Sequence, residues 1–135
     1  QACNIMKERL KKYNVIPQII WRNLEQVNKL NPKQFEVWVN EFYNAKKPSK
    51  DKGVDGVMTD GTPVQTKTNI VRYDVVAQFN NDIKYHSKVP KDMNKGIIVS
   101  QQGFDYSARS RVAEIEKKEK IKIELKTPKD MLNNN

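Results

Sequence analysis

Several residue types that mark common classes of functional site are scarce in this chain of 135 residues. Cys3 is the one cysteine, which excludes an internal disulfide and a zinc cluster of cysteines. His86 is the one histidine, which excludes a metal site built from histidine pairs. No apolar run approaches the ~20 residues of a membrane-spanning helix, so no membrane partner is expected. A glycine-rich phosphate loop of the P-loop or dinucleotide-binding type is also missing.

The composition that remains is ordinary for a folded domain but strongly basic. Charged residues make up 30% and hydrophobic residues 37% of the chain, which predicts one compact domain with a sizeable core. Lysine and arginine number 25 against 16 acidic residues, for a formal net charge of +9, and this favours nucleic acid as the partner. With no visible signal peptide and a single cysteine, a reducing, cytoplasmic location is expected.

Hydrophobic periodicity and turn signals predict the order of helices and strands. Pro17 and Asn31-Pro32 are typical helix starts, because proline suits a first helical position and asparagine caps it. Asp60-Gly61 predicts a hairpin turn. The predicted helices cover residues 1–13, 17–27, 32–42, 72–85 and 107–120, with a short one from residue 128. The predicted strands cover residues 54–58, 63–68, 96–100 and 121–125.

This order predicts an α/β fold. Strands separated by helices imply parallel crossovers, while the hairpin adds an antiparallel pair, so the central sheet should be mixed and covered by helices on both faces. The short apolar run at residues 96–100 suits a strand that is buried on both faces. Residues 1–30 are interpreted as a helical leader or linker that precedes a domain over residues 31–135.

The most informative stretch covers residues 53–67 and reads GVDGVMTDGTPVQTK. It contains the acid Asp55, a turn, and a strand on which Gln65 and Lys67 project from the same side, because strand side chains alternate. A carboxylate, an amide oxygen and an ammonium at one strand edge can hold a hard metal ion beside a phosphate. That arrangement is the chemistry of a Mg²⁺-dependent nuclease.

The hairpin register sets a geometric condition on this interpretation. A two-residue turn at Asp60-Gly61 would place Asp55 opposite Thr66 and point it away from Gln65. The functional interpretation therefore requires an offset of one residue, through a three-residue loop with a bulge or a bend at a glycine.

The spacing D-x9-Q-x-K resembles the PD-(D/E)xK nuclease superfamily, in the Mrr-type restriction endonuclease branch where glutamine replaces the second acid. The likeness extends to the block around Glu36, which reads FEVW, and to the strand KGIIVS at residues 95–100 with the turn and helix start that follow it. It spans about 95 residues, from 32 to 126.

The resemblance implies a restriction-endonuclease-like α/β/α sandwich and a role for each motif residue. Asp55, Gln65 and the backbone carbonyl of Thr66 would bind Mg²⁺, with Glu36 assisting through a water. Lys67 would orient the attacking water and offset charge on the phosphate. Each position also has a plain structural alternative, since a turn acid, an exposed strand glutamine and a solvated lysine are common.

Further polar residues are candidates for contact with DNA. The lysines before Asp55 either contact the phosphate backbone or form a solvated loop. The remaining candidates lie just past predicted strands or at the start of a helix, and the tyrosines show no spacing typical of a base-stacking platform. The candidates are Lys46, Lys47, Lys50, Lys52, Arg72, Gln101, Gln102 and Arg109.

The sequence thus predicts a Mg²⁺-dependent DNA endonuclease domain of a restriction or modification system. Cutting both strands of a duplex needs two sites, hence a homodimer or repeated engagement. The resemblance also implies fusion to, or association with, a DNA methyltransferase or helicase. The alternative is a non-catalytic DNA-binding module of a larger restriction, modification or methyltransferase protein, because an amide binds Mg²⁺ more weakly than a carboxylate.

Overall fold

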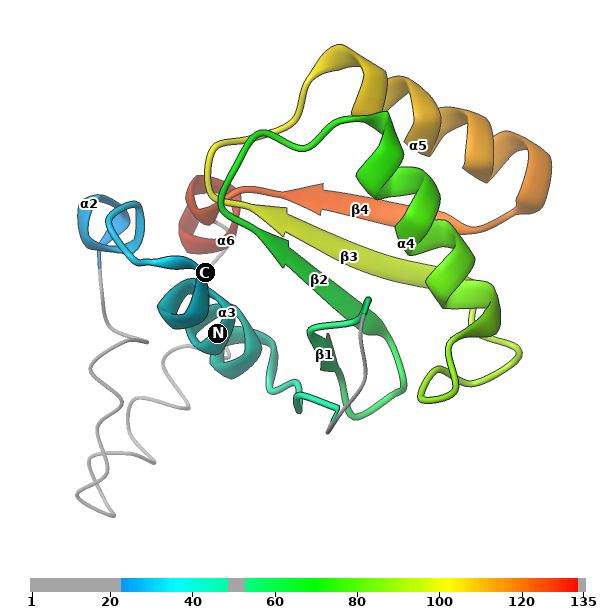
Figure 1. The fold of residues 1–135 in the computed structure, drawn as a ribbon, viewed down its shortest axis with the longest axis horizontal. Coiled ribbons are helices and arrows are strands. Elements are labelled where there is room, and N and C mark those ends of the chain that lie inside the picture. Colours follow the sequence, from blue (N-terminus) through cyan, green and yellow to red (C-terminus); the bar gives the residue numbers. More distant parts are fainter. Residues whose placement is uncertain (1–22, 49–52, 134–135) are drawn as a thin grey trace.

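The structure is a computed structural model, and it describes residues 23–48 and 53–133 (Figure 1). Within those ranges no helix is long and apolar enough to cross a membrane. The elements in chain order are α2 (Leu24–Val27), α3 (Pro32–Tyr43), β1 (Gly56–Val57), β2 (Pro63–Lys67), α4 (Tyr73–Tyr85), β3 (Lys95–Ser100), α5 (Tyr106–Glu119), β4 (Lys122–Lys126) and α6 (Pro128–Asn133).

The four strands form one mixed sheet in the order β1-β2-β3-β4. The short β1 pairs antiparallel with β2, whereas β2, β3 and β4 run parallel to one another. Helices α4 and α5 cover one face of the sheet, and α3 and α6 lie on the other (Figure 1). The predicted α/β/α sandwich with a mixed central sheet is therefore confirmed.

Two hydrophobic cores hold these layers together, one on each face of the sheet. Strand β3 shares its residues between them: Ile97 and Val99 pack against α3, while Ile98 packs against α4 and α5. All three are at least 93% buried, since their exposed fractions are 7%, 0% and 0%. Burial on both faces, predicted for this strand from its unbroken apolar run, is confirmed.

Helix α3 forms where its capping signals predict. The Asn31 side chain accepts a hydrogen bond from the Gln34 backbone N–H, the Gln34 side chain accepts one from the Asn31 backbone N–H, and Pro32 occupies the first turn. Such a reciprocal capping box satisfies backbone donors that the helix leaves unpaired. The buried stripe of Phe35, Trp38 and Val39 faces the sheet, which places the rest of α3 beside the sheet edge.

The prediction of one continuous helix over residues 17–27 is wrong at its end. Asn23 is extended and caps α2, so a helix begins at Leu24 and does not continue through residue 23. Val27 and Leu30 are buried in the core at 0% and 6% exposure. The division into a leader of residues 1–30 and a domain of residues 31–135 stays a prediction, and the helix predicted over residues 1–13 lies outside the described residues.

The hairpin between β1 and β2 has the offset that the functional interpretation requires. Gly56 pairs with Val64, and Met58 bonds to Thr62 across a three-residue loop in which Gly61 adopts a φ of 92°. A left-handed residue closing a three-residue loop is favourable for glycine and shifts the register by one. Asp55, directly before β1, donates its backbone N–H to the Val64 carbonyl and so lies along β2 beside the motif strand.

Candidate active site

Asp55 is fixed to the edge of β2 by both its backbone and its side chain. Its backbone N–H donates to the carbonyl of Val64 at 3.0 Å. Its Oδ2 accepts hydrogen bonds from the backbone N–H of Thr66 at 2.8 Å and from the Thr66 hydroxyl at 3.1 Å. The acid therefore caps the free edge of β2, directly before β1 begins at Gly56.

Helix α3 brings a second carboxylate to this edge. Glu36 lines a cavity of about 430 Å³ together with Asp55, Gln65 and Lys67, and its side chain is 18% exposed. Lys47 forms an ion pair with Glu36 at 2.9 Å. Burial raises the pKa of Asp55, the Thr66 hydrogen bonds oppose that rise, and the nearby Glu36 adds to it. Two close carboxylates of this kind favour a cation between them.

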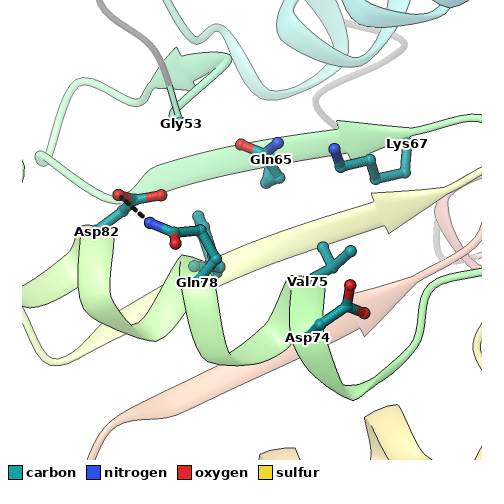
Figure 2. A pocket seen from close by; sticks show the side chains of 8 residues that line it. Gly53, Gln65, Lys67, Asp74, Val75, Gln78 and Asp82 are labelled. Carbon is teal, nitrogen blue, oxygen red and sulfur yellow. Dashed lines mark hydrogen bonds between the residues drawn. The ribbon is translucent and has the colours of Figure 1, made fainter.

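Gln65 and Lys67 project from the same side of β2, toward helix α4 (Figure 2). They line a second cavity of about 290 Å³ on the α4 face as well as the cavity that contains Asp55. The Oε1 of Gln65 is buried and has no hydrogen-bond partner among the described residues. A buried acceptor without a partner is unfavourable unless a ligand or ion satisfies it.

Helix α4 contributes a polar wall that sequence reasoning largely missed. Asp74, Gln78 and Asp82 line the second cavity opposite Gln65, and Gln78 donates to Asp82 Oδ1 at 3.3 Å (Figure 2). Their spacing of four residues places them on one helix face. That spacing is the signal in the sequence that could have found them.

The oxygen atoms at this site suit a hard cation that keeps several waters, and they are too few to surround an ion with protein ligands alone. Among residues 23–48 and 53–133, no group of three or more His, Cys, Asp or Glu side chains is placed to hold a metal ion. Mg²⁺ commonly needs just one or two protein carboxylates and keeps several waters. Asp55, together with the unpartnered Oε1 of Gln65 from the lining of the same cavity, fits that requirement.

The residues predicted to contact DNA have different surroundings in the structure. Lys47 lies at the site through its ion pair with Glu36, whereas Arg72 lies 4.0 Å from Asp105. The Gln101 amide donates to the carbonyls of Val27 and Leu30, so it ties α2 to the sheet. Lys46 pairs with Val57 in a β-bridge, and Arg109 lies over the Phe104 ring. Gln102 is exposed. Lys50 and Lys52 lie outside the described residues.

The fold and the site together define an α/β protein with an acid, an amide and an amine at the edge of a mixed sheet. The model of the restriction endonuclease family Mrr_cat matches residues 27–133, and the chain belongs to this family. It is thus a nuclease-family domain, with DNA as the substrate and a divalent metal ion as the general cofactor of the family. No curated protein and no solved structure matches the chain significantly.

Proposed function

We propose that this protein is a Mg²⁺-dependent DNA endonuclease that hydrolyses phosphodiester bonds within a restriction or modification system. The observation that carries the proposal is the meeting of Asp55, Gln65 and Lys67 around adjoining cavities at the edge of β2. Their spacing is the one by which the sequence resembles Mrr-type nucleases, and residues 27–133 match that family.

Three oxygens would hold the ion: a carboxylate oxygen of Asp55, Oε1 of Gln65 and the carbonyl of Thr66. The N–H of Thr66 points at Asp55, and the N–H and C=O of a strand residue face the same edge, which supports the carbonyl as a ligand. Glu36 would assist through a water. A bound Mg²⁺ supplies Lewis acidity and activates water at neutral pH.

The other roles belong to the protein's own cations. The Lys67 ammonium donates hydrogen bonds that orient the attacking water toward phosphorus, and it offsets negative charge that develops on the phosphate oxygens. Lys47 neutralises part of the charge of Glu36 and lies where the DNA backbone approaches. Hydrolysis forms one phosphorus–oxygen bond to water and breaks one to the leaving strand.

Cleavage of supercoiled plasmid in Mg²⁺ tests this function. Asp55→Ala and Lys67→Ala should each lower the cutting rate by ~100-fold or more, as expected for removing a ligand or an electrostatic donor. Asp92→Ala and Lys91→Ala remove the same two charges from an exposed loop and should cut like the unsubstituted protein. Equal cutting by all four variants contradicts the proposal.

A non-catalytic DNA-binding module is the second candidate, favoured by the neutral Gln65 where an acid would bind the ion more strongly. In that case the protein binds duplex DNA with a steep salt dependence, yet calorimetry detects no Mn²⁺ or Mg²⁺ binding. Detectable metal binding that Asp55→Ala abolishes would exclude this second candidate.

The context of the protein also belongs to the proposal. Double-strand cleavage needs two sites, so we propose a homodimer or two successive engagements, which sedimentation on duplex DNA distinguishes.

We further propose that the domain works in the cytoplasm, fused to or associated with a DNA methyltransferase or helicase. Co-purification of such an enzyme with the native protein tests that association.

A further inference from the structure

Two exposed tyrosines, 33 positions apart in the sequence, line one cavity at the carboxyl end of the sheet. Tyr73 begins α4 and Tyr106 begins α5, and their exposed fractions are 53% and 85%. Each helix follows a parallel strand, β2 or β3, so the crossovers carry both helix starts to the same edge. The sequence spacing of the tyrosines had indicated no stacking platform, and the fold changes that interpretation.

The cavity between them has a volume of about 320 Å³ and mixes an aromatic wall with polar groups. The guanidinium of Arg111 lies 5.8 Å from the centre of the Tyr73 ring. Ser107, Ser110 and Glu114 add hydroxyl and carboxylate groups to the lining. Such a volume lies at the lower end of the ~300–1,000 Å³ typical of small-ligand sites.

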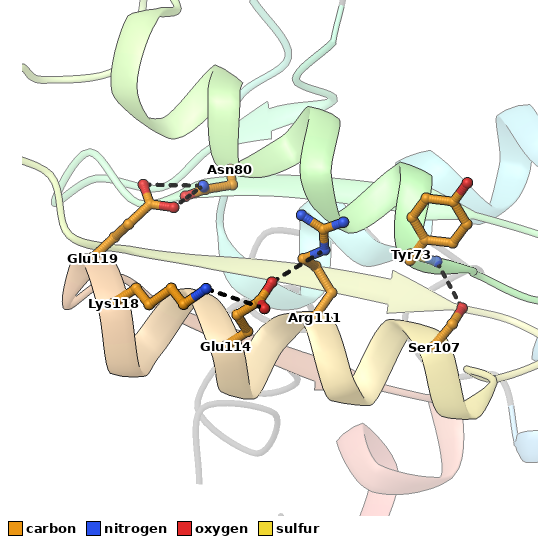
Figure 3. Close-up of polar contacts among 7 residues, drawn as sticks. All are labelled: Tyr73, Asn80, Ser107, Arg111, Glu114, Lys118 and Glu119. Carbon is orange, nitrogen blue, oxygen red and sulfur yellow. Dashed lines mark hydrogen bonds and ion pairs between the residues drawn. The ribbon is translucent and has the colours of Figure 1, made fainter.

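A hydrogen bond joins the first turn of α4 to the first turn of α5 at this cavity. The backbone N–H of Tyr73 donates to the Ser107 hydroxyl at 3.0 Å, which joins α4 to α5 (Figure 3). The Glu114 carboxylate lies 3.8 Å from the same guanidinium of Arg111 that lies over the Tyr73 ring. These contacts with α5 position Tyr73, although its side chain remains open to solvent at 53% exposure.

A hollow of about 270 Å³ lies beside the candidate active site, with which it shares Lys67. It is lined by Lys67 at one side and by Ile70 and Arg72 at the other, and Ile70 is 52% exposed. Arg72 immediately precedes Tyr73 in the chain. The hollow that contains Lys67 and the cavity that contains Tyr73 are therefore lined by consecutive residues at the start of α4, which places the tyrosines near a DNA strand with its phosphate at Lys67.

We propose that Tyr73, Tyr106 and Arg111 form a binding site for an unpaired nucleobase of the DNA substrate. An aromatic ring and a guanidinium offer stacking to any base, while the hydroxyls and Glu114 offer hydrogen bonds to a base edge. In paired DNA these base faces are stacked and covered. The inference rests on the proposed nuclease function and deepens it: the substrate has unpaired bases next to the phosphate that is cut.

Equilibrium binding without added metal tests the site separately from cutting. The probes are a fluorescein-labelled single strand, the paired duplex of the same sequence, and that duplex with a central mismatch. The unsubstituted protein should prefer the single strand and the mismatched duplex. Tyr73→Ala and Tyr106→Ala should each weaken binding to these two probes by about 5- to 100-fold, the effect of losing a base–aromatic stack, and should leave the paired duplex nearly unchanged.

Two further variants sharpen the test. Tyr85 lies at the far end of α4, is 74% exposed, and has Lys84 Nζ 5.8 Å from the centre of its ring. Tyr85→Ala should leave the affinity for all three probes unchanged. Tyr73→Phe keeps the ring and should retain binding. The salt dependence of single-strand binding should keep its slope in Tyr73→Ala, because no phosphate contact is lost.

The proposal is overturned if the Tyr73→Ala Tyr106→Ala double variant binds the single strand as tightly as Tyr85→Ala does. It is also overturned if the double variant loses affinity equally for paired and unpaired probes. Plasmid cutting separates this outcome from failure of the nuclease function. If the double variant cuts normally and its binding is unchanged, the base-site proposal fails and the nuclease proposal stands. If the double variant selectively loses single-strand binding but the unsubstituted protein never cuts, the nuclease proposal fails and the base-site proposal stands.

Discussion

The side-chain amide of Asn40, on α3, donates a 2.9 Å hydrogen bond to the backbone carbonyl of Asp55. Asn40 is 8% exposed, so a buried side chain joins the helix to the loop that carries the candidate metal ligand. Gly56, the next residue, lies against the same side chain, and a Cβ there would overlap Asn40 Oδ1. Helix α3 thus positions Asp55 as well as supplying Glu36.

Asn40→Ala should slow DNA cutting more than it destabilises the fold. Losing one buried hydrogen bond should lower the free energy of unfolding by ~1 kcal/mol, while a small displacement of Asp55 should slow cutting by ~10- to 100-fold. Plasmid cleavage and urea unfolding measure the two effects.

Asn80→Ala is the matched control for that experiment. Asn80 is also buried, at 6% exposure, and its amide bonds to Glu119 at 3.2 Å between α4 and α5, away from Asp55. It should lose similar stability and keep its cutting rate. Equal cutting rates in both asparagine variants would show that the Asn40 bond does not position the acid.

Gln65→Glu should tighten Mg²⁺ binding on the order of tenfold, because a carboxylate brings charge that an amide oxygen lacks. Without metal, the new charge beside Asp55 and Glu36 should lower the melting temperature, and Mg²⁺ should restore it. Calorimetry and thermal melting measure both effects. Gln102→Glu, which adds the same charge at an exposed position, should show neither, and an unchanged Mg²⁺ affinity in Gln65→Glu would exclude this glutamine as a ligand.

Gly96→Ala should destabilise the protein by ~1–3 kcal/mol, the usual effect of overpacking a core. An added Cβ would lie 2.6 Å from Phe79 Cε2 and 2.9 Å from Ile83 Cδ1, where α4 crosses β3. Urea unfolding measures the change. Combining it with Phe79→Leu should recover part of the loss, since the two sites are in contact, and strictly additive effects would argue against the clash.

Asp60→Asn should lower stability at pH 7 but not at pH 2. Hydrogen bonds from Thr62, and then the Lys95 ion pair at 3.2 Å, lower the pKa of Asp60 to about 2. A lowered pKa stabilises the fold above the unfolded pKa of ~3.9, and that stability is lost as the pH falls toward 2. The melting-temperature difference from the unsubstituted protein should therefore shrink between those pH values, and a constant difference would contradict the assignment.

Local signals predicted most elements of this fold because they act over a few residues. The Asn31-Pro32 start of α3, the hairpin turn before β2 and the buried run of β3 each depend on neighbours in the chain, and all three appear as expected. The prediction from apolar periodicity failed at residue 23, where Asn23 is extended and caps α2.

The sequence by itself determined the α/β class, the basic charge and the motif that contains Asp55, Gln65 and Lys67. Tertiary structure alone decided the one-residue offset at Gly61, the attachment of Gln101 to α2 and the pairing of Tyr73 with Tyr106. The physical reason is range: periodicity and capping report on adjacent turns and strands, whereas these contacts depend on how parallel crossovers bring distant segments to one edge of a sheet.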